Sequence, residues 1–320
     1  MNILGLILSG LFLYLCFRSL DAETLKQVFH MKNPVLLLAV IPLNFLLIAV
    51  RNWVWLKLLQ PLQKLPFQKV FQILNIGYMA NNLLPLKAGE FFRASYIAKK
   101  WSLPYAQVLT TVGLERYFSG LSLLLIFLGV TWFLPIPLWL KSGAYVMAAV
   151  LLAVQVTVII LSKKKNTLAR YKDRKAWRYR ILQFLHDISE ASQSLRSLNS
   201  FTTLTLLSIM TWILQALMLQ LVAFAFEVPL SFSGSCFVMV AINLAIALPS
   251  APSSLGTFEY AALLSLNWLG IERAQALGIG IYFHLLQIIP VTLLGLFYYF
   301  RWGMKIKDRP PETLTQKISK

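Results

Sequence analysis

The sequence has few charged residues and very few acidic ones. Only 13% of its 320 residues are charged, against about 25% in a typical soluble domain, and 58% are hydrophobic. This composition excludes an ordinary soluble domain. Because apolar runs of about 20 residues recur along the chain, the sequence predicts an integral membrane protein.

Cysteine and histidine are also scarce, which excludes most familiar site chemistries. Cys16 and Cys236 lie in separate apolar runs, so neither a disulfide nor a zinc site is indicated. A P-loop, a Gly-x-Ser-x-Gly elbow and an Asp-rich diphosphate motif are absent from the sequence. We therefore expect no cofactor, no metal site and no catalytic residue, and we expect that the protein is not an enzyme.

The excess of basic over acidic residues indicates which segments of the chain lie on the cytoplasmic side of the membrane. The chain has 30 Lys and Arg against 12 Asp and Glu, a formal charge of +18. On a polytopic chain such an excess usually marks the cytoplasmic side, and here it gathers in residues 163–180 and in the C-terminal tail. We therefore expect a cytoplasmic loop at 163–200, a cytoplasmic tail at 306–320, and no nucleic-acid partner.

The long apolar runs predict about six transmembrane helices, because each is long enough to cross a hydrocarbon core of roughly 30 Å. The first run lacks a basic leader and an obvious cleavage site, so we interpret it as a retained helix. With 163–180 inside, both termini are expected in the cytoplasm. The predicted spans are 2–17, 34–56, 104–134, 138–162, 201–226 and 272–301.

Two further stretches, 68–101 and 232–269, do not fit as spans. In each, an apolar segment leads to Asn, Pro and then Gly and Glu, after which a short apolar helix follows. These segments are too short to cross a bilayer and are typical of re-entrant helical hairpins.

The two hairpins belong to a predicted repeat. Each is followed by an Ala-Gln pair and a long span, with the pairs starting at Ala106 and Ala274. The units 68–134 and 232–301 come out oppositely oriented when the basic loop is placed inside. The sequence therefore predicts an all-α polytopic protein with an inverted repeat, an architecture that recurs among transporters.

The first hairpin, "NNLLPLKAGEFFRASYIAKK", carries chemistry at its break. Backbone broken by Pro85 and Gly89 inside a membrane requires a surrounding cavity. The start of the returning helix and Arg93 are suited to an anion such as a phosphate. Glu90 is equally compatible with stabilising the helix dipole and with holding Arg93.

The second hairpin has its own break, supplied by Pro249, Pro252 and Gly256. We expect Thr257 to cap the returning helix. Glu259 lies in the first turn of that helix, where a structural and a functional role remain equally open.

Glu115 and Arg116 lie deep within the predicted span 104–134, where charges are costly. Neighbouring residues on a helix do not face each other, so each needs another partner. We expect Arg116 to pair with Glu90 or Glu259, and Glu115 to pair with Arg93. The network is either purely structural or one that an anionic headgroup enters by replacing a carboxylate.

Other polar residues occupy comparable depths. His284 and Gln287 lie in the last long span, and His284 is either a hydrogen-bonded packing residue or a group that titrates near neutral pH. We expect the asparagines to bridge the two breaks: Asn81, Asn82 and Asn243.

These motifs resemble the lysylphosphatidylglycerol synthase transmembrane region family, also called flippase-like or UPF0104 proteins. The resemblance covers about 1–305, which it marks as a single flippase-like transmembrane domain. Lys87 stands where members often carry Arg, which keeps the positive charge at an expected headgroup-binding position. The matching residues are Asn82, Pro85, Gly89, Glu90, Arg93, Glu115, Arg116, Pro249, Pro252, Gly256 and Glu259.

The resemblance implies translocation or handling of an amphiphile made elsewhere. In the multiple peptide resistance factor a homologous region is joined to an aminoacyl-lipid synthase, which we do not find here. The implied partners are a phospholipid, an aminoacyl-lipid or a polyprenyl-phosphate glycolipid, together with a separate lipid-modifying enzyme. The implied location is the cytoplasmic (inner) membrane of a bacterium or archaeon.

Within that reading, we expect Arg93, Arg116 and Lys87 to bind the headgroup. Two alternatives remain. One is a membrane enzyme in which Glu90 or Glu259 acts as general base with His284 assisting. The other is a scaffold for a lipid-synthesis complex that uses the basic segment 163–180.

Overall fold

The computed structural model of the chain describes residues 3–18, 28–84, 87–163, 198–247 and 250–303. In these ranges the regular secondary structure is helical, and the helices fall where the apolar runs predict them. The helices are α1 (Ile3–Phe17), α3 (Leu36–Leu59), α4 (Phe67–Leu83), α5 (Ala88–Lys100), α6 (Tyr105–Val130), α7 (Leu138–Lys163), α9 (Leu198–Ala225), α10 (Phe232–Ala245), the 3-10 helix η3 (Pro252–Ser254), α11 (Thr257–Trp268) and α12 (Arg273–Gly303).

Four of the described helices are long and apolar enough to cross a membrane, namely α3, α6, α9 and α12. The polytopic character is thereby confirmed. α1 has 15 residues and reaches about 22 Å, which is shorter than a hydrocarbon core of about 30 Å. α7 has 26 residues, but many side chains of its C-terminal half lie outside the described set. The number of six spans therefore stays a prediction.

Two sets of four helices share one arrangement. In α3–α6 and in α9–α12, a long helix is followed by two short helices and a second long helix. The first helix of each set packs against its second and fourth, and the two short helices pack against each other. α1 and α7 lie outside this pattern. The common layout agrees with the repeat expected from the sequence.

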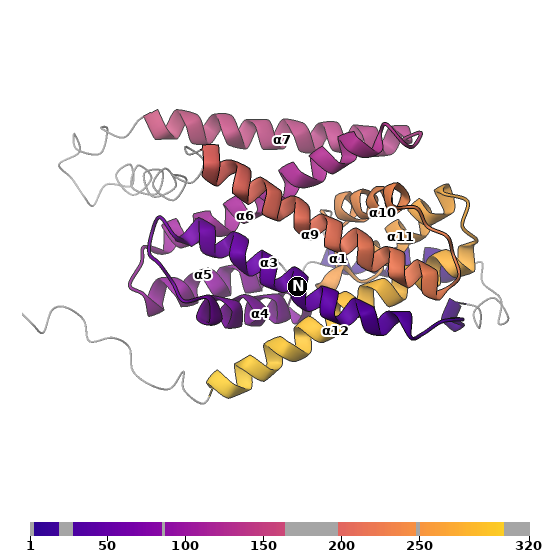
Figure 1. Cartoon of the computed structure of the whole chain (residues 1–320), viewed down its shortest axis with the longest axis horizontal. Helices are drawn as coiled ribbons and strands as arrows, with labels where there is room; N and C mark the ends of the chain where they lie inside the picture. Colours follow the sequence, from indigo (N-terminus) through magenta and orange to yellow (C-terminus); the bar gives the residue numbers. More distant parts are fainter. Residues whose placement is uncertain (1–2, 19–27, 85–86, 164–197, 248–249, 304–320) are drawn as a thin grey trace, which may run out of the picture.

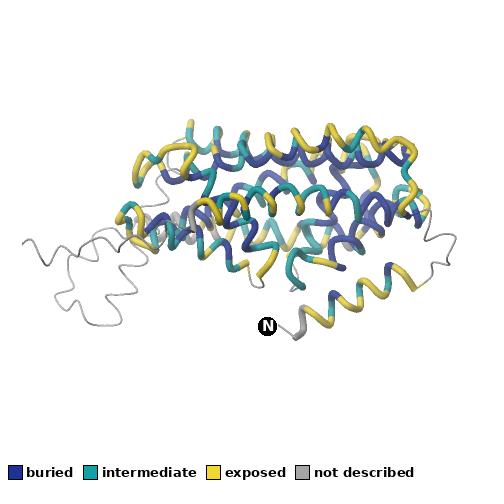
Figure 2. Tube along the Cα trace, turned by 90° about the horizontal axis from the view of Figure 1, so that it is seen from below, coloured by how far each residue is buried: buried dark blue, intermediate teal, exposed yellow. Residues whose placement is uncertain are grey.

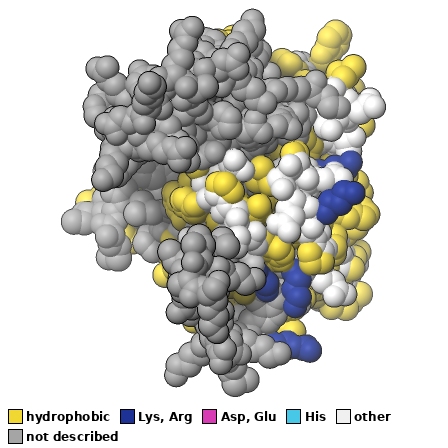
Figure 3. All heavy atoms as spheres, turned by 90° about the vertical axis from the view of Figure 1, so that its left-hand side faces the viewer, with side chains coloured by type: hydrophobic (Ala, Val, Ile, Leu, Met, Phe, Trp, Pro, Cys, Tyr) yellow, Lys and Arg dark blue, Asp and Glu magenta, His cyan; other side chains and the backbone are white. Residues whose placement is uncertain are grey.

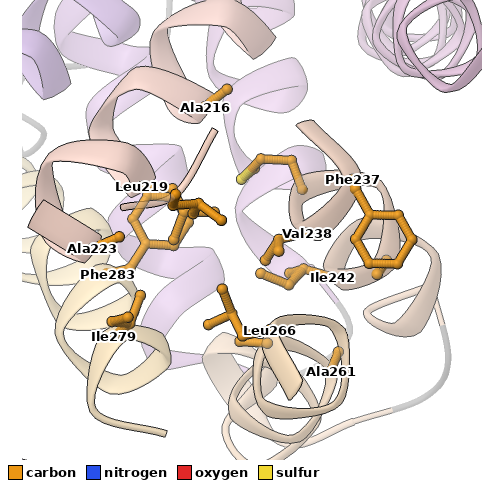
Figure 4. Packing of buried hydrophobic residues seen from close by; sticks show 14 of the residues in the cluster. Ala216, Leu219, Ala223, Phe237, Val238, Ile242, Ala261, Leu266, Ile279 and Phe283 are labelled. Carbon is orange, nitrogen blue, oxygen red and sulfur yellow. The ribbon is translucent and has the colours of Figure 1, made fainter. Parts of the chain in front are cut away.

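Each set builds its own core. Helices α3–α6 bury one apolar cluster that includes Trp55, Ile73 and Ile97, with Val291 of α12 added to it. Helices α9–α12 dominate a larger cluster, shown in Figure 4. The side chains labelled there are Ala216, Leu219 and Ala223 of α9, Phe237, Val238 and Ile242 of α10, Ala261 and Leu266 of α11, and Ile279 and Phe283 of α12.

The two sets run in opposite directions. α3 and α9 pack against each other and point to opposite ends of the long axis. α6 and α12 also point to opposite ends (Figure 1). Buried positions face the interior of the bundle, and exposed positions form its outer surface (Figure 2). The outer surface carries large apolar side chains such as Leu38, Phe45 and Leu128, as a lipid-facing surface requires.

α1 lies at the side of the bundle (Figure 2). It packs against α11, where the Phe12 ring stacks on Tyr260 with 5.2 Å between centroids. Arg273 at the start of α12 donates a 2.6 Å hydrogen bond to the carbonyl oxygen of Leu15. These contacts hold α1 beside the second short-helix pair.

One end of the molecule is basic. Figure 3 shows this end, the left-hand side of Figure 1, where the described atoms in view include Lys and Arg but no Asp, Glu or His. The last turns of α3 and α5 lie there and contribute Lys57, Lys99 and Lys100, all exposed. The described part of this end is therefore basic, which bears on orientation in a membrane.

Candidate functional site

Both helix breaks open onto one cavity of about 520 Å3. Its volume lies within the range of small-molecule sites, about 300–1,000 Å3. Residues from seven of the α-helices, from η3 and from both breaks form its walls. The lining residues are Leu6, Asn44, Leu47, Ile48, Arg51, Tyr78, Asn81, Asn82, Leu84, Lys87, Glu90, Arg116, Ile246, Ala247, Ser250, Ala251, Pro252, Ser253, Ser254, Phe258, His284, Gln287, Ile288 and Val291.

The first break separates α4 from α5. Asn81, in the last turn of α4, accepts a 2.8 Å hydrogen bond from the backbone N–H of Gly89, so it bridges this break as expected. Lys87 precedes α5 in a left-handed conformation with φ of 52°. A Cβ atom on Gly89 would lie 1.8 Å from the carbonyl oxygen of Gly77, so only glycine permits this approach of α5 to α4.

The second break, between α10 and α11, is longer and is closed by a carboxylate. Glu259 accepts a 2.7 Å hydrogen bond from the backbone N–H of Gly256, whose φ is +82°. The expectation that Thr257 caps α11 is wrong, because Gly256 occupies the N-cap position and the Thr257 hydroxyl is buried without a hydrogen-bond partner. The cap is therefore the Glu259 side chain of the same helix.

Arg93 and Glu115 form a buried ion pair. Their side chains are 1% and 8% exposed, with 2.7 Å between Nη2 and Oε2, as the expected pairing requires. The contact lacks hydrogen-bond alignment, since both Arg93 Nη atoms are buried without a hydrogen-bond acceptor. The guanidinium carbon lies 4.5 Å from the Trp55 ring centroid, which adds a cation–π contact.

This geometry corrects the expected role of Arg93. Neither Arg93 nor Glu115 lines the cavity, so Arg93 is not presented to a headgroup in this structure. The guanidinium turns toward α3 and α6 instead. We interpret the pair as structural support behind the cavity wall, in the way that buried charges are usually retained only when paired.

Arg116 and Glu90 form the second expected pair, and both line the cavity. Arg116 Nη2 lies 2.6 Å from Glu90 Oε1, and the two side chains are 47% and 17% exposed. Because Arg116 is half exposed, the pair contributes little to stability. An anion in the cavity is therefore able to compete with Glu90 for the guanidinium.

Arg51 is a cavity residue that the sequence analysis missed. It lines the wall contributed by α3, and its guanidinium carbon lies 5.7 Å from the Tyr78 ring centroid. Among the described residues neither Arg51 nor Lys87 has a carboxylate within ion-pair distance. An arginine inside the apolar run 34–56 is the same signal that identified Arg116, and it would have revealed Arg51.

His284 and Glu259 connect the second break to α12. His284 Nδ1 lies 2.6 Å from Glu259 Oε1, and the imidazole stacks on Phe258 with 3.9 Å between ring centroids. His284 lines the cavity, whereas Glu259 lies behind it. The hydrogen-bonded packing role considered for His284 is therefore observed, in a position that also faces the cavity.

The remaining asparagines divide between two roles. Asn82 lines the cavity and donates a 2.9 Å hydrogen bond to the hydroxyl of Thr292, which ties α4 to α12. Asn243 donates to the carbonyl oxygen of Met239 in its own helix and does not line the cavity, so the expectation that it bridges a break is wrong.

Several predicted features lie outside the described residues. These are Pro85, Pro249, residues 164–197 of the basic loop, and the tail 306–320. Among the residues that the structure describes, no group of three or more His, Cys, Asp or Glu is close enough to hold a metal ion.

The fold and the cavity define a class: a polytopic membrane protein with a polar chamber between two broken helical segments. Residues 2–295 match the model of the lysylphosphatidylglycerol synthase TM region, and the chain belongs to this family. It is also similar to the UPF0104 membrane protein MJ1078 of Methanocaldococcus jannaschii. The two are 24% identical over 245 residues, which cover 72% of this chain and 97% of that relative.

Proposed function

We propose that this protein is a flippase-like lipid translocase that passes a phosphate-containing headgroup through the cavity. The observation that carries the proposal is that both helix breaks and three cationic side chains line one chamber. Arg51, Lys87 and Arg116 receive the phosphate, and Glu90 holds Arg116 when the chamber is empty. Arg93 supports the wall through Glu115. The acyl chains stay in the surrounding lipid.

The arrangement supports two re-entrant hairpins in an inverted repeat. By the positive-inside rule, the basic end of Figure 3 faces the cytoplasm. The pair α4–α5 then enters from the cytoplasmic side and α10–α11 from the outer side, since α3 and α9 run oppositely. Two such hairpins meeting at a shared site are suited to alternating access.

The proposal includes a cellular setting. We place the protein in the cytoplasmic (inner) membrane with both termini inside, where a separate lipid-modifying enzyme supplies its cargo. The family's description names lysylphosphatidylglycerol synthase, which supports a role in lipid handling. Translocation by this chain is our inference from the cavity.

The His284–Glu259 pair favours one rival, a membrane enzyme acting on a lipid-linked group. An imidazole held by a carboxylate at a cavity wall is a common general-base arrangement. The rival also requires a nucleophile or an activated water beside His284. It predicts a change in the covalent mass of the lipid, which translocation does not produce.

The test is transbilayer movement in proteoliposomes. Fluorescent phosphatidylglycerol, phosphatidylcholine and a polyprenyl phosphate are compared for the wild type, Arg116→Gln and the control Lys57→Gln. Lys57 is exposed in the last turn of α3 and lies outside the cavity. We expect faster movement of at least one phosphate lipid, lost in Arg116→Gln and kept in Lys57→Gln.

Two results would count against the proposal. Movement no faster than in empty liposomes for every lipid would contradict a translocase. A lipid whose mass changes during incubation, detected by mass spectrometry, would favour the enzyme instead.

A further inference from the structure

The charges and hydrogen-bond donors of the cavity indicate which headgroup it takes, if the protein handles lipids as proposed above. The lining contains three cationic side chains and one carboxylate, Glu90, which Arg116 already contacts at 2.6 Å. Arg51 and Lys87 remain without a carboxylate partner among the described residues. The cavity therefore contains two positive charges that no carboxylate of the described residues neutralises.

The groups behind the wall do not remove this excess. Arg93 and Glu115 neutralise each other at 2.7 Å. Glu259 lies behind the lining and is shared between the Gly256 N–H and His284, so it does not pair with Arg51 or Lys87. The positive charge of the lining therefore stays uncompensated.

Unpaired donors add to the positive charge. Ser253 and Gln287 are lining residues, and the Ser253 hydroxyl oxygen and the Gln287 amide nitrogen are buried without a hydrogen-bond partner. Ser253 is held in a left-handed conformation with φ of 59° in η3 of the second break. Buried donors without acceptors call for a ligand rich in acceptor oxygens.

We propose that the cavity selects a headgroup bearing a phosphomonoester or diphosphate dianion and rejects an aminoacylated, cationic headgroup. A phosphomonoester has a charge near −2 and three strong acceptor oxygens. It compensates Arg51 from α3 and Lys87 from the first break, and it accepts hydrogen bonds from Ser253 of the second break. This set uses both breaks at once.

An aminoacyl headgroup finds no counterpart here. Its ammonium group needs a carboxylate or an aromatic face, and the one lining carboxylate is held by Arg116. The two aromatic rings of the lining already have contacts of this kind, because Arg51 lies over Tyr78 and His284 stacks on Phe258. Repulsion between the ammonium group and the lining cations, together with the lack of a free carboxylate, disfavours binding of the cationic lipid.

The experiment is competition binding with the full chain in mixed detergent micelles. Radiolabelled phosphatidic acid is displaced by unlabelled phosphatidic acid, phosphatidylglycerol, lysylphosphatidylglycerol or inorganic phosphate. We expect phosphatidic acid to compete about tenfold better than either other lipid, as one added charge-assisted hydrogen bond implies. Inorganic phosphate is expected to compete weakly.

The variants are Arg51→Gln and Lys87→Gln, with Arg301→Gln as the matched control. Arg301 is exposed near the end of α12 and lies over Phe297 at 5.8 Å, much as Arg51 lies over Tyr78, but it does not line the cavity. We expect Arg51→Gln and Lys87→Gln each to weaken phosphatidic acid binding about tenfold. Arg301→Gln is expected to bind like the wild type. Melting curves identify any variant that does not fold.

The possible results separate this inference from the proposed function. Equal or better competition by lysylphosphatidylglycerol, or equal loss in Arg301→Gln, would overturn the selectivity while leaving lipid movement to its own assay. Competition by inorganic phosphate as strong as by phosphatidic acid would support the dianion site but assign it to a soluble ligand. That last result would contradict the translocase.

Discussion

The two short-helix pairs share a layout but present different chemistry to the cavity. The pair α4–α5 contributes Lys87 and Glu90 to the lining, and Arg93 lies one turn behind. The pair α10–α11 contributes serines, Pro252 and Phe258, and its one carboxylate, Glu259, caps its own helix. The first pair is therefore ionic, and the second supplies hydroxyl groups, backbone and an aromatic face.

The two pairs therefore differ in their chemistry although their helix layout is alike. The first pair, together with Arg51 and Arg116 from neighbouring long helices, forms the positive wall. The second pair contacts His284 through Glu259 and Phe258 and forms another part of the wall, with α11 capped by the Glu259 side chain. Substitutions in the two pairs should therefore affect stability and lipid handling differently.

The largest stability effect is expected for Arg93→Met. It leaves Glu115 buried without a partner, and breaking a buried ion pair typically costs about 3–5 kcal/mol. Thermal or denaturant unfolding in detergent measures the loss. The double variant Arg93→Met with Glu115→Leu removes both charges and is expected to regain part of it. A single variant as stable as the wild type would refute the supporting role.

Gly89→Ala is expected to be the next most damaging change. The added methyl group would meet the Gly77 carbonyl oxygen, and such overpacking costs about 1–3 kcal/mol or more. The matched control is Gly113→Ala in α6, where nothing lies within 4 Å of the added Cβ. Similar melting temperatures for the two variants would show that the approach of α5 to α4 is looser than observed.

Glu259→Gln tests the second pair. The amide keeps the shape but loses the charged acceptor for the Gly256 N–H and for His284, a loss of about 1 kcal/mol. Glu272→Gln, at an exposed position just before α12, serves as control. If both variants lose the same stability, the Glu259 cap has no special role.

Arg116→Gln should have the smallest effect on stability and a large one on lipid movement. Because the guanidinium is 47% exposed, its contact with Glu90 is worth about 0–1 kcal/mol. Unfolding and transport are measured on the same preparation. A large loss of stability with unchanged transport would reverse the roles assigned to the two arginines.

Much of this architecture follows from the sequence. Apolar run length and the Pro and Gly breaks predict the ten α-helices of the described residues to within a few residues, apart from the overlong 104–134 run, which ends at Val130. The cost of a charge inside an apolar run led to both ion pairs. These features depend on local patterns and on the need to pair charges.

Other features required the packed structure. The turn of Arg93 toward Trp55 and away from the cavity depends on how α3 and α5 are placed in the bundle, which residue types do not specify. The cap of α11 was assigned to Thr257 because side-chain preference at N-caps favours it over Gly256. In the structure Gly256 is the N-cap residue, because its φ is +82° and because the backbone of α1 lies so close that a Cβ atom would not fit.

Site-specific photocross-linking tests whether both breaks contact one headgroup in one cavity. A photoreactive residue replaces Leu84 of the first break or Ile246 beside the second, both of which line the cavity. Leu264, exposed on α11 and outside the lining, serves as control. The membrane contains equal amounts of radiolabelled phosphatidic acid and phosphatidylcholine.

We expect photoreactive residues at the Leu84 and Ile246 positions both to cross-link phosphatidic acid in preference to phosphatidylcholine. The substitution Arg51→Gln is expected to remove this preference at both positions. The Leu264 position should capture the two lipids in proportion to their abundance. Preference at one break alone, or the same capture at all three positions, would contradict a shared headgroup site.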